Sequence, residues 1–234
     1  MILAGGRGVR VGGEVAKQFL PLGDRTVLEH SVAAFARHPA VDRVLVVAPA
    51  DALERVRELL ADPAVLVTAG GAERHESTRC AVDALRAAGA SDDDAVLVHD
   101  AARPFVPARV IDEAVESLAS HDVVATLVPS SDTMVRIDPE TGRIVEALVR
   151  EELRRHQTPQ GFRLGVLDDA HRRAAAGQVA VPAVTDDCTL VCAAHPGVVV
   201  GVVEGAPEAF KITDALDLRL ARAVLAEQDT APHD

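Results

Sequence analysis

The sequence is poor in aromatic residues and in basic ones. Aromatic residues make up 2% of the chain, and neither Trp nor Tyr occurs. Asp and Glu number 36 against 24 Lys and Arg, which gives a formal net charge of −12. Nucleic-acid binding is therefore disfavoured, because it requires a basic stripe and aromatic rings on which bases stack. The charge indicates a soluble, self-repelling surface, so an anionic ligand has to be bound by local positive groups.

Long apolar runs and a cysteine framework are also missing. No stretch approaches the roughly 20 apolar residues of a membrane-spanning helix, and "MILAGGRG" has no signal-peptide pattern. The three cysteines, Cys80, Cys188 and Cys192, indicate reduced thiols. We expect a cytoplasmic protein without a membrane partner. Cys188 and Cys192 could share a helix face, but no His or Cys lies nearby at zinc-binding spacing, so packing roles are favoured.

Lysine is scarce as well: only Lys17 and Lys211 occur among the 24 basic residues. Lys17 follows the stretch "GGRGVRVGG", which lacks the Gly-Lys-Ser/Thr of a Walker loop. It is only a partial dinucleotide fingerprint, because Val11 stands at a glycine position.

Two interpretations of this glycine-rich stretch stay open. It is either a tight turn or flexible N-terminus, with two lysines retained by chance, or a phosphate-binding loop. In the second case, bare backbone N–H groups cradle phosphate oxygens. Arg7, Arg10 and Lys17 then supply positive charge close by.

Apolar runs alternate with helical patterns along the chain. The runs are continuously apolar, as parallel strands covered on both faces are, and lie at 43–49, 65–70, 95–100, 123–129 and 198–205. Helices are expected at 26–38, 51–60, 108–120 and about 214–227. The pattern predicts a doubly wound, mostly parallel, Rossmann-like α/β sheet. We expect one domain over 1–228 and a flexible tail over 229–234.

Capping and spacing support these helices. Thr26 with Glu29, and Asp51 with Glu54, have the spacing of helix-start signals. Three stripes are predicted to face the core: Leu28, Val32 and Phe35; Ile111, Val115 and Leu118; and Leu216, Leu220 and Val224.

Residues 132–150 break the alternation. Two short alternating runs flank the turn sequence "DPETG", which predicts a β-hairpin. An isolated hairpin is marginally stable in water, so we expect a projecting arm that packs on a second subunit.

The stretch "HDAARPF" follows the strand predicted at 95–100. Ligands of open α/β sheets bind beyond the carboxyl ends of the strands, so Asp100 is placed to hold Mg²⁺ together with substrate phosphates. A helix cap or an ion pair between Asp100 and Arg103 would also explain an aspartate at this position. A phosphohydrolase of the His-Asp type is disfavoured, because it needs further histidines on helices.

A further polar set lies downstream. Threonines with an arginine and a lysine would suit a phosphorylated polyol, although each alone has an ordinary explanation. The set comprises Thr133, Arg150, Thr158, Thr185 and Lys211.

Ordered motifs carry a family resemblance over nearly the whole chain. They are "LAGGRGVR", "AKQFLPLG", "VLEHSVAAF", "GGAERHES", "VHDAARPF", "SDTM", "QTPQGF", "TDD" and "FKIT". The set resembles the 2-C-methyl-D-erythritol 4-phosphate cytidylyltransferases, which belong to the pyrimidine nucleotidyltransferases. The resemblance implies attack of a substrate phosphate on the α-phosphorus of CTP, Mg²⁺ as cofactor and a homodimer formed through the arm.

The resemblance also implies residue roles. Catalytic charge would come from Arg10, Lys17, Arg150 and Lys211. The nucleotide would lie against Ala4, Gly5, Gly6, Gly8, Gly71, Ala72, Ser77 and Ala101. The polyol phosphate would contact Asp100, Arg103, Thr133, Thr158 and Thr185, with Asp100 also holding Mg²⁺ and the partner's arm supplying Thr133 and Arg150.

The chain departs from the family pattern at Val9, Ala16 and Ala209, where a basic residue, Pro and Asn are usual. Val9 removes a proposed charge. Parts of the sequence also resemble the sister enzymes that act on ribitol 5-phosphate, so that acceptor or a related polyol phosphate stays open. A nucleotide-binding module without turnover is a hypothesis from a different class. A dinucleotide-dependent oxidoreductase is a third hypothesis, against which the incomplete fingerprint speaks.

Overall fold

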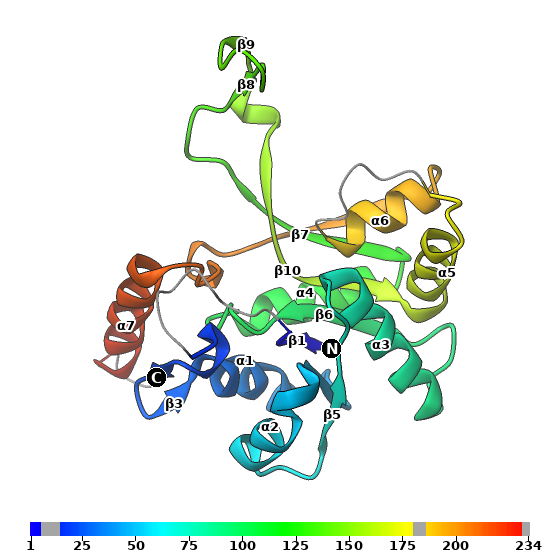
Figure 1. The fold of residues 1–234 in the computed structure, drawn as a ribbon, viewed down its shortest axis with the longest axis vertical. Helices are drawn as coiled ribbons and strands as arrows, with labels where there is room; N and C mark the ends of the chain where they lie inside the picture. The colour runs from blue at the N-terminus through cyan, green and yellow to red at the C-terminus, as the bar shows by residue number, and fades with distance from the viewer. Residues whose placement is uncertain (6–14, 180–185, 231–234) are drawn as a thin grey trace.

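A seven-stranded sheet forms the centre of the computed structural model, which describes residues 1–5, 15–179 and 186–230 (Figure 1). In spatial order the strands are β11 (Val200–Glu204), β7 (Val123–Pro129), β10 (Arg154–Arg163), β6 (Ala95–Asp100), β1 (Ile2–Leu3), β4 (Val44–Ala48) and β5 (Val65–Ala69). Neighbours run parallel except at β10, which is antiparallel to β6 and β7. The predicted mostly parallel α/β fold is confirmed.

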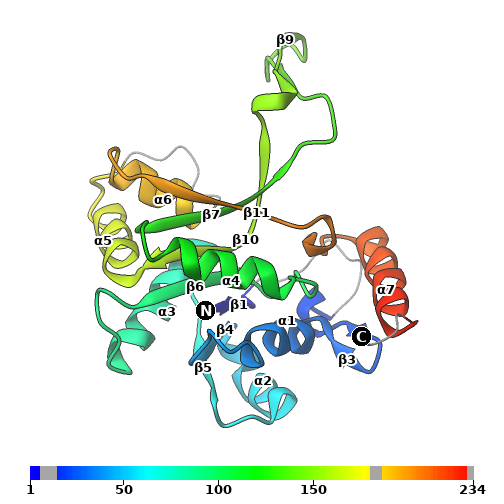
Figure 2. The ribbon, with the colours of Figure 1, turned by 180° about the vertical axis from the view of Figure 1, so that it is seen from behind.

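Helices cover both faces of the sheet because its strands are apolar on both sides. One face packs against α1 (Val27–Ala36), α2 (Leu53–Leu60) and α4 (Ala108–Ser117). The other packs against α3 (Arg74–Ala87), α5 (Leu164–Ala175) and α6 (Asp187–Ala194). Figure 2 views the molecule from behind, and there α1 and α4 lie in front of the strands. Among the described residues, no helix has the length and apolar character needed to cross a bilayer.

The last helix, α7 (Ala215–Thr230), packs beside the sheet rather than on it (Figure 1). It covers the small hairpin β2 (Pro21–Leu22) and β3 (Arg25–Thr26) through a cluster that includes Leu22, Phe105 and Ile212. Short 3₁₀ turns lie at Lys17–Phe19, Ala50–Ala52, Arg150–Glu152 and Pro207–Ala209. Because α7 continues to Thr230, it passes the predicted domain end at 228; residues 231–234 lie outside the described part.

Besides the helices α3, α5 and α6, the sequence analysis does not predict strand β10. Its sequence, "RRHQTPQGFR", has no apolar run and contains Pro159, in a cis peptide bond with Thr158. It forms a strand because it pairs with β6 on one side and with β7 on the other. Its register with β7 shifts between Gln157 and Gly161. The Thr126 hydroxyl donates to the Pro159 carbonyl at 2.6 Å.

Two of the helix predictions need correction. The Thr26–Glu29 capping box of α1 is confirmed. The Asp51–Glu54 signal is wrong, since Asp51 lies in a 3₁₀ turn and no side chain of the described chain caps α2. The Leu216 and Leu220 stripe of α7 is also wrong: these side chains are 63% and 51% exposed, while Leu218 and Ala221 are buried.

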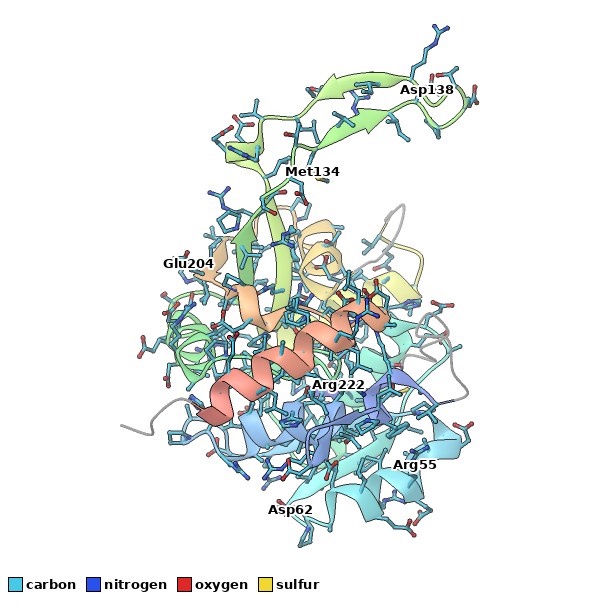
Figure 3. All side chains as sticks on the ribbon, turned by 90° about the vertical axis from the view of Figure 1, so that its left-hand side faces the viewer. Arg55, Asp62, Met134, Asp138, Glu204 and Arg222 are labelled. Carbon is cyan, nitrogen blue, oxygen red and sulfur yellow. The ribbon has the colours of Figure 1, made fainter. Side chains whose placement is uncertain are left out.

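Residues 132–150 form the predicted hairpin arm, with strands β8 (Val135–Ile137) and β9 (Ile144–Ala147). Asp138 holds the turn by accepting hydrogen bonds from the backbone N–H groups of Glu140 and Thr141. Gly142 closes it with a φ of +68°, a conformation that favours glycine. Figure 3 shows Met134 near the base of the arm and Asp138 at its tip, away from the sheet.

Candidate active site

The ends of β6, β1 and β5, at one edge of the sheet, form the candidate site. Leu3 of β1 pairs with Asp100 of β6, so Ala4 and Gly5 emerge beside Asp100. Gly70 and Gly71 follow β5 at the same edge of the sheet. This is the edge at which ligands of open α/β sheets bind.

Asp100 is surrounded by three cations. Lys211 Nζ donates to Asp100 Oδ2 at 2.8 Å, and Arg103 Nε lies 3.7 Å from the same oxygen. Arg74 Nε lies 3.8 Å from Oδ1. Burial alone would raise the pKa of Asp100, but the charges of Lys211, Arg74 and Arg103 hold it well below its usual range. The carboxylate is therefore ionised, and the cluster has a net positive charge.

The loop that carries Lys211 is positioned by its neighbours. Ile212 is fully buried, and its N–H donates to the Ala102 carbonyl at 2.8 Å. Arg103 donates to the Ala209 carbonyl at 2.8 Å. Lys211 thus projects toward Asp100 from a loop attached to the end of β6, although the two residues are 111 positions apart.

A chain of hydrogen bonds fixes the backbone at Asp100. The Asp100 N–H donates to Thr158 Oγ1 at 3.1 Å, and Thr158 Oγ1 lies 3.0 Å from His99 Nδ1. His99 Nε2 lies 3.0 Å from the Arg103 carbonyl, which can only accept, so Nε2 carries the proton and Nδ1 accepts from Thr158. Burial lowers the pKa of His99 to about 4, which keeps the ring neutral at pH 7. His99 is therefore a structural partner of Thr158.

The glycines beside this cluster make room for the first turn of α3. A Cβ at Gly70 would lie 2.7 Å from Ser77 Oγ, and one at Gly5 would lie 3.3 Å from it. A Cβ at Gly71 would lie 2.3 Å from Glu76 Cβ, so no side chain fits there. The structure thus brings Gly5, Gly71 and Ser77 together, as predicted, and adds Gly70.

Other predicted nucleotide-binding residues have backbones that are engaged within the chain. Ala4 donates to the Val47 carbonyl and accepts from Gln18 Nε2. Ala101 donates to the Leu3 carbonyl and accepts from the Ser31 hydroxyl. Ala72 is exposed at the start of α3.

Lys17 lies in the 3₁₀ turn that Gln18 attaches to the end of β1. Burial raises the pKa of Asp217, at the start of α7, but hydrogen bonds from Thr213 and Asp214 and the positive charge of Lys17 together lower it. Gly6, Gly8, Arg10 and Thr185 lie outside the described residues.

Thr133 and Arg150 lie on the arm, apart from the Asp100 cluster. Both side chains are exposed, and Arg150 contacts Glu151 at 3.7 Å. The arm that carries them rises away from the sheet (Figure 1). Within one chain, the structure does not bring these two residues to those predicted site residues that it describes.

Sequence reasoning missed the support behind Asp100. Arg74 donates to Asp187 Oδ2 at 2.5 Å while facing Asp100, so it bridges two buried carboxylates. His171 Nε2 lies 3.1 Å from the other Asp187 oxygen. The motifs "GGAERHES" and "TDD" contain Arg74 and Asp187, but a contact across 113 positions has no spacing signal.

The chain is similar to known proteins over nearly its whole length. The family model for 2-C-methyl-D-erythritol 4-phosphate cytidylyltransferase matches residues 1–227. The enzyme of that name from Thermobifida fusca is 43% identical over 233 residues, covering 96% of this chain and 91% of that one. Ribitol-5-phosphate cytidylyltransferase from Lactiplantibacillus plantarum is 35% identical over 233 residues, covering 97% of each chain.

A solved structure supports the same conclusion. The crystal structure of 4-diphosphocytidyl-2C-methyl-D-erythritol synthase from Anaerococcus prevotii superimposes with a TM-score of 0.82 at 26% identity, covering 96% of this chain and 94% of that one. The resemblance inferred from the motifs is confirmed. The chain belongs to the 2-C-methyl-D-erythritol 4-phosphate cytidylyltransferase family and is a nucleotidyltransferase.

Proposed function

We propose that this chain transfers the cytidylyl group of CTP to 2-C-methyl-D-erythritol 4-phosphate in the non-mevalonate isoprenoid pathway. A phosphate oxygen of the acceptor attacks the α-phosphorus, the bond from that phosphorus to the bridging oxygen breaks, and pyrophosphate leaves. The observation that carries the proposal is the positive cluster around Asp100. Arg103 Nε is buried and has no hydrogen-bond partner among the described residues, so it is available to a phosphate oxygen.

The chemistry needs positioning more than covalent participation by the protein. Lys211 and Arg103 hold the attacking phosphate beside Asp100. Thr158, whose hydroxyl already contacts the Asp100 backbone, lines the polyol side together with Thr185. Gly5, Gly71 and Ser77 border the nucleotide, with Ala4, Gly6, Gly8, Ala72 and Ala101 in the same segments.

Lys17 and Arg10 stabilise charge on the α-phosphate and the departing pyrophosphate. A Lys17→Ala change is expected to lower kcat by about 10² or more, since preorganised charge opposite a developing anion contributes that much. Pyrophosphate release under saturating CTP and acceptor measures it. Wild-type turnover in this variant would remove Lys17 from the reaction.

Mg²⁺ is the proposed cofactor, and the residues at the strand end fit it. Mg²⁺ is commonly bound by one or two carboxylates together with substrate phosphates. Asp100 offers a carboxylate, and its Oδ1, 3.8 Å from Arg74 Nε, is less engaged than the Oδ2 bound to Lys211. Asp100 would therefore hold the ion. When bound, Mg²⁺ neutralises phosphate charge and polarises the α-phosphorus.

A homodimer formed through the arm is part of the proposal. Apolar arm side chains are exposed in the single chain: Met134, Val135, Ile137, Ile144, Val145 and Val149. Such a surface is typical of an interface. In the dimer, Thr133 and Arg150 of one subunit reach the site of the other. Three free thiols support a reducing, cytoplasmic location.

The acceptor is tested directly. The full chain is incubated with Mg²⁺ and CTP, with either 2-C-methyl-D-erythritol 4-phosphate or ribitol 5-phosphate. Pyrophosphate release and the mass of the cytidine diphosphate product are measured. Turnover with the first acceptor alone is expected. Turnover with ribitol 5-phosphate alone would keep the mechanism and change the substrate, in line with the Lactiplantibacillus plantarum relative. CTP binding without turnover would support a binding module.

A further inference from the structure

Three potential metal ligands, all distant from Asp100 in the sequence, lie close together beside the sheet. They are His156 on β10, Asp186 at the N-cap of α6 and Cys188 in the first turn of that helix. Each offers one ligand atom, and the three atoms lie within 4.8 Å of one another. The sequence prediction that Cys188 has no metal-binding partner rests on nearby spacing only. His156 lies on a separate element, which only the fold brings next to α6.

Gln160 orients two of these ligands. Its Oε1 accepts hydrogen bonds from the backbone N–H groups of Asp187 and Cys188, at 3.2 and 3.4 Å. Its Nε2 must therefore be the donor, and it lies 3.2 Å from both His156 Nδ1 and Asp186 Oδ1. The His156 imidazole and the Asp186 carboxylate thus each direct a lone pair at the same electropositive group, Gln160 Nε2.

Asp186 is also held from the helix side. The Thr189 N–H donates to Asp186 Oδ1 and the Thr189 hydroxyl donates to Oδ2, each at 2.9 Å. Hydrogen bonds of this kind orient the ligands of protein metal sites and raise their affinity.

We propose that His156, Asp186 and Cys188 form a binding site for a zinc-class divalent cation, distinct from the Mg²⁺ proposed at Asp100. A thiolate with an imidazole and a carboxylate selects Zn²⁺ or Co²⁺ over Mg²⁺, which prefers oxygen ligands. Three protein ligands leave one position open to water. On binding, the Cys188 thiol releases its proton to solvent and the sulfur forms the metal bond.

The geometry requires a small contraction. Zinc–ligand bonds of about 2.0–2.3 Å place tetrahedral ligand atoms roughly 3.3–3.8 Å apart, so the present group has to close by about 1 Å. His156 is exposed and can move, whereas Cys188 is buried and forms the floor of the site. The ion enters from the His156 side and displaces the Gln160 hydrogen bonds to the two acceptors.

Charge also suits a dication. Asp186 and a Cys188 thiolate together supply two negative charges. The neighbouring Asp187 is already paired with Arg74 and His171. Burial and the neighbouring Asp186 and Asp187 raise the pKa of the Cys188 thiol, so the ion has to displace its proton.

The test is titration of the chelator-treated, full-length protein with Co²⁺ and Zn²⁺ in the absence of CTP. One Co²⁺ per chain is expected, with the near-ultraviolet charge-transfer absorption of a cobalt–thiolate bond. Zn²⁺ should displace Co²⁺ and millimolar Mg²⁺ should not. His156→Ala and Cys188→Ala are each expected to weaken binding by at least about 10-fold.

Cys192→Ala is the matched control, because Cys192 lies one turn further along α6 and is exposed. It should bind Co²⁺ like the wild type. His156→Ala decides the matter, since the loss of an exposed side chain leaves the fold intact, as thermal melting will verify. Absence of the cobalt–thiolate band would overturn the site, and so would unchanged binding in His156→Ala or loss of binding in Cys192→Ala.

Discussion

The end of β6 and the hairpin arm both carry predicted substrate-binding residues, but they differ in how these residues are held. At the strand end, Lys211, Arg103 and Thr158 are each positioned by contacts within 3.7 Å of Asp100 or its backbone. On the arm, Arg150 has one ion pair within the described part of the chain, with its neighbour Glu151. The first region is preorganised by its own chain, whereas the second, among the described residues, has no comparable set of contacts.

The apolar surfaces of the two regions differ in the same way. Behind Asp100, Ile212, Val98 and Ala101 are almost fully buried. On the arm, Ile144 is 67% exposed and Ile137 is 53% exposed. A two-stranded hairpin is marginally stable alone in water. An exposed apolar surface of this size on it is typical of a surface that another protein surface covers. The strand end is thus covered by its own chain, and in the proposed dimer a second subunit would cover the arm.

The largest loss of turnover is expected from removing Lys211 from the preorganised region. Lys211→Ala takes away the group closest to Asp100 and is expected to lower kcat by about 10²–10³, as for the loss of one preorganised group facing transition-state charge. Steady-state pyrophosphate release measures the effect. Arg222→Ala, an exposed change on α7, is the control and should retain wild-type turnover. A Lys211→Ala enzyme within threefold of wild type would show that the cluster does not act on the reaction.

Much of the preorganised region can be predicted from the sequence, because its elements have local signals. The apolar runs give β4, β5, β6, β7 and β11, and Thr26 with Glu29 gives the start of α1. The apolar run at 95–100 also predicts Asp100 at a strand end, where it lies. An ion pair between Arg103 and Asp100 is one of the interpretations that the sequence leaves open, and the structure shows that pair together with Lys211.

What could not be predicted depends on contacts distant in sequence. Strand β10 has polar side chains whose pairing partners come from two other strands, so neither periodicity nor composition marks it. Arg74 bridges Asp100 and Asp187, a contact that exists only after the sheet has formed. Leu216 and Leu220 have helical spacing, but α7 packs through Leu218 and Ala221 instead.

The support beneath Asp100 makes stability depend on pH. His99 has a pKa of about 4 in the folded chain and about 6.5 when exposed. Because the folded pKa is lower, the unfolded chain binds the extra proton first, so stability is present above pH 6.5 and is lost as the pH falls toward 4. The contribution lost between pH 7 and pH 5 is about 2 kcal/mol.

Urea unfolding at those two pH values checks this expectation. His99→Gln keeps one donor and one acceptor but does not titrate, so its free energy of unfolding should fall less than that of the wild type. Parallel losses in the two proteins would mean that His99 is not the titrating group. No comparable pH effect is expected from arm residues, which are exposed.

Mixing two inactive variants tests whether the arm acts between subunits. Arg150→Ala removes the arm residue and Lys211→Ala removes the strand-end residue. If Arg150 serves the partner's site, a heterodimer has one intact site. Random exchange in a symmetric dimer then restores about a quarter of the wild-type sites. Pyrophosphate release after subunit exchange measures the recovery. Activity that stays at the level of the separate variants would place Arg150 in its own subunit's site.

The smallest effect should come from an arm residue whose partner lies on the arm itself. Arg136 of β8 pairs with Glu146 of β9 at 2.8 Å, and both side chains are at least half exposed. Exposed pairs of this kind contribute little, so Arg136→Ala is expected to change the free energy of unfolding by less than about 0.5 kcal/mol. Turnover should also stay within twofold of wild type, in contrast to Arg150→Ala. Steady-state assays and urea unfolding of the two variants side by side measure the difference. Equal loss of turnover in both would mean that the arm acts through its overall packing rather than through the Arg150 guanidinium.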